Sequence, residues 1–156
     1  MLLAKPPAPD PRQRAWARFV VAQALLFERI EEAFDAAGLP ELAWYDILWV
    51  LESAEGGRLR MHDLARQAVV SRSNVTRLTD RLEKAGLVAR ADCPVDGRGT
   101  VCELTAKGRA LRAKMWQVYK KQIDALFGRH LDTREAELIS TAFQRIIDSS
   151  NQRKST

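Results

Sequence analysis

The sequence predicts a mainly α-helical fold that contains one small β-hairpin. Apolar residues recur at helical spacing toward both ends of the 156-residue chain. Between about residue 58 and residue 105 the elements become short. Two runs in that region, 87–93 and 100–105, have strand character and flank a turn with two glycines. The length is typical of one domain, which we take to be residues 1–156.

The composition is that of a globular protein, with 46% hydrophobic and 29% charged residues. The longest apolar runs, 19–27 and 42–51, are about half the roughly 20 residues that a membrane span requires. The N-terminus lacks the pattern of a signal peptide, and two cysteines are too few for a disulfide scaffold. We therefore expect a cytoplasmic protein with no membrane association.

The charge is unevenly distributed, although the net charge is +5. Residues 31–55 contain seven acidic side chains and no basic one, whereas residues 56–110 contain eleven basic and six acidic side chains. A basic central region beside an acidic segment is typical of a surface that binds a polyanion. A mixed, solvated surface would explain the charges equally well.

The N-terminal half begins with two predicted helices. Asp10 and Pro11 form a helix start, and the apolar spacing continues to a stop at Gly38. A second helix over about 41–54 is apolar almost all round, which predicts a central and buried position.

Two longer helices are predicted after residue 105. One spans about 106–127, with Thr105 as its cap, and the other spans about 133–149, where Asp132 and Glu135 have capping-box spacing. Apolar residues at opposite ends of the chain, including Trp16 and Ile146, indicate that these ends pack on each other or on a second copy.

Between these helices, residues 41–105 have the element order of a winged helix-turn-helix lobe. A short helix over 61–68 precedes a helix over 72–85 capped by Ser71, and the hairpin follows. In the second of these helices Val75, Leu78 and Leu82 share one face, which must point to the core.

The opposite face of that helix carries groups suited to a DNA major groove, since arginine can pair with guanine and hydroxyls can bind bases or phosphates. An ordinary amphipathic surface helix is the alternative. Arg98 on the glycine-containing wing tip is a candidate for the minor groove, and Arg58, Arg60, Arg66 and Arg90 are candidates for phosphate contacts. The candidate DNA-binding residues are Arg60, Arg72, Ser73, Asn74, Thr76, Arg77, Lys84 and Arg98.

The segment from Leu64 to Gly108 resembles the MarR family of bacterial transcriptional regulators. The resemblance rests on Leu64-Ala65, Ser71 to Arg77, Asp80 to Val88, Asp96-Gly97-Arg98-Gly99 and Leu104 to Gly108, in this order and spacing. It implies a homodimer formed by helices 10–38 and 106–150. It also implies binding to a pseudo-palindromic operator in double-stranded DNA, usually as a repressor, and release by a small aromatic acid or phenolic effector.

Carried over by position, the resemblance makes Ser73, Thr76 and Arg77 base-reading residues and Arg98 the wing-tip residue. Asp80 is expected to fix the wing by pairing with Arg98 or another wing arginine, and Asp96 is a second supporting residue. The resemblance also implies an effector pocket between the first two helices and the DNA-binding lobe. Its candidate residues are Trp16, Phe27, Trp44, Tyr45 and Trp49, although aromatic residues at helical spacing are more often plain core.

The remaining special residues give weaker indications. If the hairpin turn is centred between Asp96 and Gly99, Cys93 and Cys102 face each other and form a candidate redox pair. Two reduced thiols are the alternative. His62 and His130 lack neighbours at ligand spacing, so we predict no metal site and no cofactor.

The sequence also bears on two other classes of function. The sequence lacks G-x-S-x-G, H-E-x-x-H, P-loop and G-x-G-x-x-G motifs, so we predict that the chain is not an enzyme. A winged helix that serves only as a protein-interaction module is the alternative to a sequence-specific DNA-binding regulator. Basic residues on the exposed helix face favour the regulator.

Overall fold

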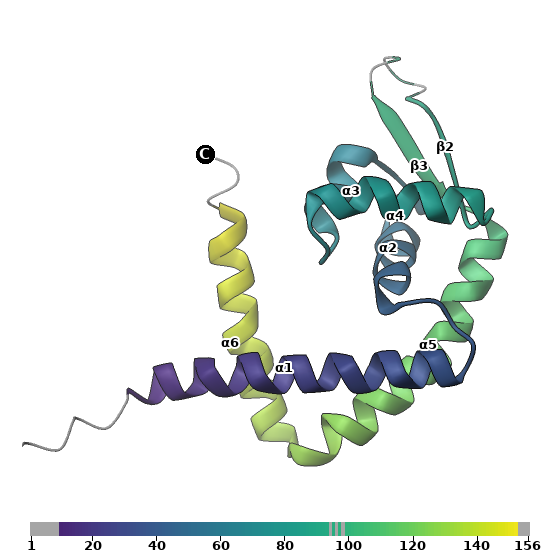
Figure 1. Ribbon diagram of the computed structural model, residues 1–156. Helices are drawn as coiled ribbons and strands as arrows, with labels where there is room; N and C mark the ends of the chain where they lie inside the picture. The colour runs from purple at the N-terminus through teal and green to yellow at the C-terminus, as the bar shows by residue number, and fades with distance from the viewer. Residues whose placement is uncertain (1–9, 94, 96, 98, 153–156) are drawn as a thin grey trace, which may run out of the picture. The chain divides into compact units, whose positions relative to one another are not determined.

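The computed structural model describes residues 10–93, 95, 97 and 99–152 (Figure 1). The elements are α1 (Pro11–Ala36), α2 (Leu42–Ser53), η1 (Glu55–Gly57), β1 (Arg58–Arg60), α3 (Met61–Gln67), α4 (Arg72–Lys84), β2 (Val88–Asp92), β3 (Thr100–Leu104), α5 (Ala106–Leu126), η2 (Gly128–His130) and α6 (Thr133–Gln152). The chain divides into two compact units, residues 1–119 and 120–156. The mainly helical fold with a small wing sheet confirms the predicted fold class.

The first unit begins with the predicted helix start. The Asp10 carboxylate accepts the backbone N–H of Arg12 at 2.8 Å, and Pro11 occupies the first helical position, where a missing N–H costs nothing. Farther along α1, Ile30 and Phe34 are buried. The C-terminal half of α1 therefore belongs to the core of this unit.

Helix α2 is the centre of the first unit. It contacts α1, α3, α4 and the small sheet, and Ile47, Leu48 and Leu51 are fully buried. This confirms the prediction that a helix apolar almost all round is surrounded by other elements.

Helices α3 and α4 form the helix-turn-helix, with Leu64, Val75, Leu78 and Leu82 buried between them and α2. Helix α4 ends in a Schellman motif, in which the N–H of Leu87 donates to the carbonyl of Leu82 at 2.9 Å. Gly86 makes this possible because its φ of +74° lies in the left-handed region. The predicted core face and stop signal of α4 are thus confirmed.

The predicted hairpin forms from β2 and β3, and β1 adds a third strand in the antiparallel order β1-β3-β2. The register differs from the predicted one by three residues, because Cys102 lies opposite Arg90. The N–H of Cys93 instead donates to the carbonyl of Gly99 at 3.0 Å. Cys93 is thus paired with a residue three positions before Cys102, its expected partner. The prediction that Cys93 and Cys102 face each other is therefore wrong.

Helix α5 begins at the wing and continues past the end of the first unit. The Thr105 hydroxyl accepts the N–H of Gly108 at 3.0 Å, as expected for a cap. In the second unit, Asp132 and Glu135 form the predicted capping box: Glu135 N–H donates to the Asp132 carboxylate at 2.8 Å, and Asp132 N–H donates to that of Glu135 at 3.0 Å.

Candidate nucleic-acid interface and adjoining pocket

The outward face of α4 carries polar side chains opposite its buried face. Ser73, Thr76, Arg77 and Lys84 are exposed and Asn74 is half-buried. The guanidinium of Arg77 donates to the Asn74 side-chain oxygen at 2.8 Å, which holds it along the exposed face. This face can present the Arg77 guanidinium, which can donate two hydrogen bonds, and the hydroxyls of Ser73 and Thr76 to base edges. The backbone of Arg72 begins α4, but its side chain lies outside the described part of the structure.

The wing is joined to α4 through Arg90 of β2. Its guanidinium lies 2.6 Å from Asp80 Oδ1 and 2.7 Å from Glu83 Oε2, and its backbone N–H donates to Glu83 at 3.0 Å. Hydrogen bonds from Arg90 lower the pKa of Glu83, and the same bonds raise the pKa of Arg90. The expected pairing of Asp80 with a wing arginine is therefore made by Arg90. Arg98 and Asp96 lie outside the described residues.

The other basic residues around α4 differ in their exposure and in their contacts. Arg58 and Arg60 on β1 and Arg66 on α3 are exposed. Arg90, a candidate phosphate contact, is instead engaged by two carboxylates. Arg81 lies 2.5 Å from Glu41 and stacks over the ring of Trp44 at 5.3 Å. The exposed basic side chains in this region thus belong to β1, α3 and α4 itself.

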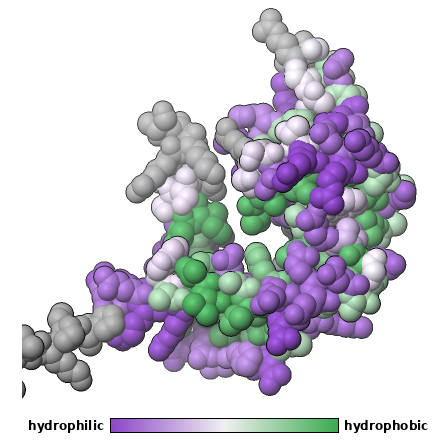
Figure 2. Space-filling view, in the orientation of Figure 1, coloured by the Kyte–Doolittle hydropathy of each residue, from purple (hydrophilic) through white to green (hydrophobic). Residues whose placement is uncertain are grey.

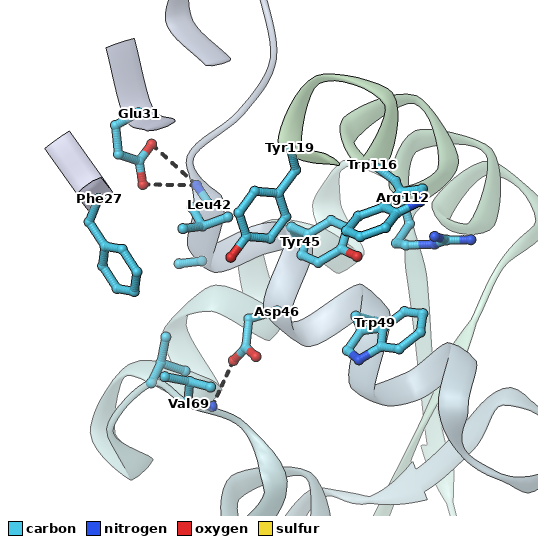
Figure 3. Close-up of a pocket in the computed structure, with 12 residues that line it drawn as sticks. Phe27, Glu31, Leu42, Tyr45, Asp46, Trp49, Val69, Arg112, Trp116 and Tyr119 are labelled. Atoms are coloured by element: carbon cyan, nitrogen blue, oxygen red, sulfur yellow. Dashed lines mark hydrogen bonds between the residues drawn. The ribbon is translucent and has the colours of Figure 1, made fainter. Parts of the chain in front are cut away.

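The first unit also contains a cavity of about 680 Å³ (Figure 3). Its walls come from α1, α2, the segment before α4 and α5, and its lining residues are Phe27, Glu31, Leu42, Ala43, Tyr45, Asp46, Trp49, Val69, Val70, Arg112, Trp116 and Tyr119. Phe27, Tyr45 and Trp49 were among the predicted pocket residues.

Two predicted pocket residues do not line the cavity. Trp16 is near the start of α1 and is 66% exposed. The indole N–H of Trp44 donates to Glu41 at 3.2 Å, and its ring contacts Arg81. Helical spacing places aromatic residues on a helix but does not fix which of them face the same space.

Sequence reasoning missed the wall formed by α5, which contributes Arg112, Trp116 and Tyr119. Their spacing of four and three residues places them on one face of the helix, which is the signal that could have identified them. Tyr45 is the centre of the resulting aromatic cluster. Its ring centroid lies 5.1 Å from that of Tyr119 and 6.2 Å from that of Trp116. Burial raises the pKa of both tyrosines.

Charged groups in the pocket are tied to the surrounding backbone and side chains. The Glu31 carboxylate accepts the N–H of Leu42 at 3.0 Å, and Asp46 accepts the N–H of Val69 at 2.8 Å. Burial raises the pKa of both carboxyls, and these backbone hydrogen bonds partly oppose the shift. Arg112 Nε lies 2.5 Å from Glu52 Oε2.

The two thiols are both buried and free. Burial raises the pKa of Cys102 to about 12, because the thiolate would be poorly solvated. Among the described residues, no group of three His, Cys, Asp or Glu side chains is arranged to hold a metal ion. Within the same residues, no helix is both long and apolar enough to cross a bilayer.

Comparison with known proteins agrees with this geometry. The HTH-type transcriptional regulator FarR of Neisseria gonorrhoeae is 31% identical over 107 residues, which are 69% of this chain and 71% of FarR. The MarR family transcriptional regulator AbsC of Streptomyces coelicolor is 28% identical with a TM-score of 0.82, over 93% of this chain and 97% of AbsC. Sco3205, a MarR family regulator from the same organism solved in complex with DNA, is 25% identical with a TM-score of 0.80, over 88% and 89% of the two chains.

The segment that a family model matches includes α2, the helix-turn-helix and much of the wing. The model is described as the MarR family and matches residues 37–99. The order of helices and the wing sheet agree with the AbsC fold over nearly the whole chain. The chain therefore belongs to the MarR family of transcriptional regulators.

Proposed function

We propose that the protein is a dimeric, sequence-specific DNA-binding repressor that dissociates from its operator when it binds a small aromatic ligand. The observation that carries the proposal is the outward face of α4, where Ser73, Thr76 and Arg77 are exposed on a helix anchored by a buried face. The related Sco3205 was solved in complex with DNA, which supports a DNA-binding role for this chain.

Base recognition would depend most on Arg77. An exposed arginine on a recognition helix can donate two hydrogen bonds to one guanine, a pattern that no other base pair offers in the major groove. Asn74 holds the Arg77 side chain at 2.8 Å, so less side-chain freedom is lost on binding. Exposed Arg60 and Lys84 would contact phosphates, which increase affinity without reading sequence.

Dimer formation would cover apolar side chains that are exposed on α1 and α6. Trp16 is 66% exposed and Leu25 is 57% exposed on α1, and Ile146 is 59% exposed on α6. In the space-filling view, apolar side chains are visible at the surface among charged ones (Figure 2). Exposed apolar clusters of this kind mark protein interfaces. A two-fold dimer would present two α4 helices to successive turns of DNA.

The pocket is suited to control DNA binding because it includes the segment that precedes α4. Val69 and Val70 line the cavity, and Ser71, the N-cap residue of α4, follows them. Asp46 of α2 holds this segment through the N–H of Val69. A ligand that contacts Asp46 would move the start of α4 and so change the position of its reading face.

The test is fluorescence anisotropy on the purified protein with the DNA upstream of its own gene and with a scrambled duplex, at two salt concentrations. We expect a clear preference for the upstream DNA and an affinity that falls steeply with salt, as counterions are released from phosphates. Equal and weak binding to both duplexes would support a protein-interaction module instead. Sedimentation analysis of the same sample tests the dimer.

A further inference from the structure

Half of the pocket lining comes from the acidic segment of the chain, residues 31–55. Six of its twelve lining residues belong to 31–55, where the sequence has seven acidic side chains and no basic one. Glu31 and Asp46 bring two carboxylates to the lining, and Arg112 is the one basic residue among the lining residues. Two of the seven acidic side chains of this segment therefore line the cavity, against one basic side chain.

The positive charge of Arg112 is already matched. Its Nε lies 2.5 Å from a Glu52 carboxylate oxygen, and both side chains are largely buried, at 15% and 16% exposure. Arg109 contacts the other oxygen of the same carboxylate at 3.2 Å. In Figure 3 the guanidinium of Arg112 extends away from Glu31 and Asp46. An anionic ligand would thus meet a neutralised arginine and two carboxylates.

The two lining carboxylates are only partly satisfied by the protein. Asp46 accepts backbone N–H groups of the segment before α4, and Glu31 accepts that of Leu42. Among the described residues, neither carboxylate forms a salt bridge with a basic side chain. Burial raises the pKa of both, which shows that their charged forms are poorly solvated. A bound cation would supply the charge partner that these groups lack.

Aromatic faces complete a site suited to a cation with an apolar body. Tyr45 and Trp49 are nearly parallel, with ring centroids 6.4 Å apart, and Trp116 stacks on Tyr45 from α5. The guanidinium carbon of Arg112 lies over the ring of Trp49, 5.6 Å from the ring centroid, in a cation–π contact. Aromatic faces attract cations through their quadrupoles and also bury apolar ligand surface.

We propose that the ligand of this pocket is a hydrophobic organic cation, such as an aromatic amine or quaternary ammonium, whose charge is met by Asp46 and Glu31 and whose apolar body lies against Tyr45, Trp49 and Trp116. The proposal rests on the proposed function, in which a small aromatic ligand controls DNA binding. It replaces the expected aromatic acid by a ligand of opposite charge.

The test uses two probes that share a ring and differ in charge, (1-naphthylmethyl)trimethylammonium and 1-naphthylacetate. Isothermal titration calorimetry on the full chain at neutral pH measures the affinity for each probe. We expect the cation to bind at least about tenfold more tightly than the anion, a difference of about 1.4 kcal/mol. Tighter binding of the anion, or binding of neither probe, would overturn the proposal.

Variants locate the charge partners. Asp46→Asn and Glu31→Gln each keep an oxygen that can accept the backbone N–H, so both are expected to fold. Each should weaken binding of the cation by about tenfold and narrow its preference over the anion. Glu55→Gln, an exposed acid of the same segment outside this cavity, is the matched control and should leave both affinities unchanged. Equal loss in the control and in the pocket variants would contradict the assignment.

Anisotropy with operator DNA separates this inference from the proposed function. If the parent binds DNA specifically but does not prefer the cationic probe, the ligand class is wrong and the regulator stands. If the parent binds the cation but has no DNA preference, the pocket assignment stands and the proposed function fails.

Discussion

Replacing Gly108 with alanine is expected to destabilise the protein, because this glycine is where α5 approaches the start of the wing. A Cβ at this position would overlap the carbonyl oxygen of Leu87 and would lie 2.7 Å from Leu104 Cδ1. The Leu87 carbonyl is itself fixed, since it accepts the backbone N–H of Thr105 at 3.1 Å and its hydroxyl at 2.9 Å. The methyl group can be accommodated only if α5 moves away from the wing.

The magnitude follows from three contributions. Overpacking of a close-packed site costs about 1–3 kcal/mol, and each weakened hydrogen bond to Leu87 costs about 1 kcal/mol. The higher helix propensity of alanine stabilises the variant by about 1 kcal/mol and offsets part of this loss. We therefore expect Gly108→Ala to lower the free energy of unfolding by about 2–4 kcal/mol and the Tm by about 5–15 °C.

Urea and thermal unfolding followed by circular dichroism measure this change. Gly128→Ala is the matched control, because its new Cβ would be no closer than 3.7 Å to any neighbouring atom outside its own vicinity in the chain. The control should be neutral or slightly stabilising. If the two variants unfold at the same urea concentration, the close approach of α5 to Leu87 is not a feature of the folded protein.

Three further predictions concern the DNA-binding face, the wing and the thiols. Arg77→Ala should weaken binding to the preferred duplex by about 10- to 100-fold and reduce its preference over scrambled DNA, whereas Arg129→Ala should change neither; anisotropy decides this. Arg90→Ala should destabilise the protein near pH 7 but much less near pH 3. The pKa of Glu83 is lowered in the folded protein, so its pairing contributes above the ordinary value and is lost as the pH falls; urea unfolding at both pH values checks the sign. With a pKa of about 12, Cys102 should resist iodoacetamide at pH 8 until the protein unfolds, and rapid labelling of the native protein would refute its burial.

Local signals were sufficient to predict the helices and the core face of α4. The helix cap at Asp10 and the capping box at Asp132 each join residues no more than three positions apart. Both interactions can therefore be recognised from a short stretch of sequence. The burial of Val75 and Leu82 follows from helical periodicity alone.

Long-range relations were harder to predict. The hairpin register depends on how the turn closes between Cys93 and Gly99, and this changes which residue lies opposite Cys102. The pocket depends on α5, which lies more than sixty residues from Tyr45 in the sequence. The periodicity of one helix does not reveal that Trp116 of another packs against it.

DNA reading by α4 is tested most directly by selection of bound duplexes from a random DNA pool, with the parent protein and with Arg77→Ala in parallel. We expect the parent to enrich an inverted repeat whose half-sites are separated by about 10 base pairs, and Arg77→Ala to lose the base preference at one position in each half-site. No enrichment by the parent, or an identical motif with both proteins, would contradict the claim that the exposed face of α4 reads DNA sequence.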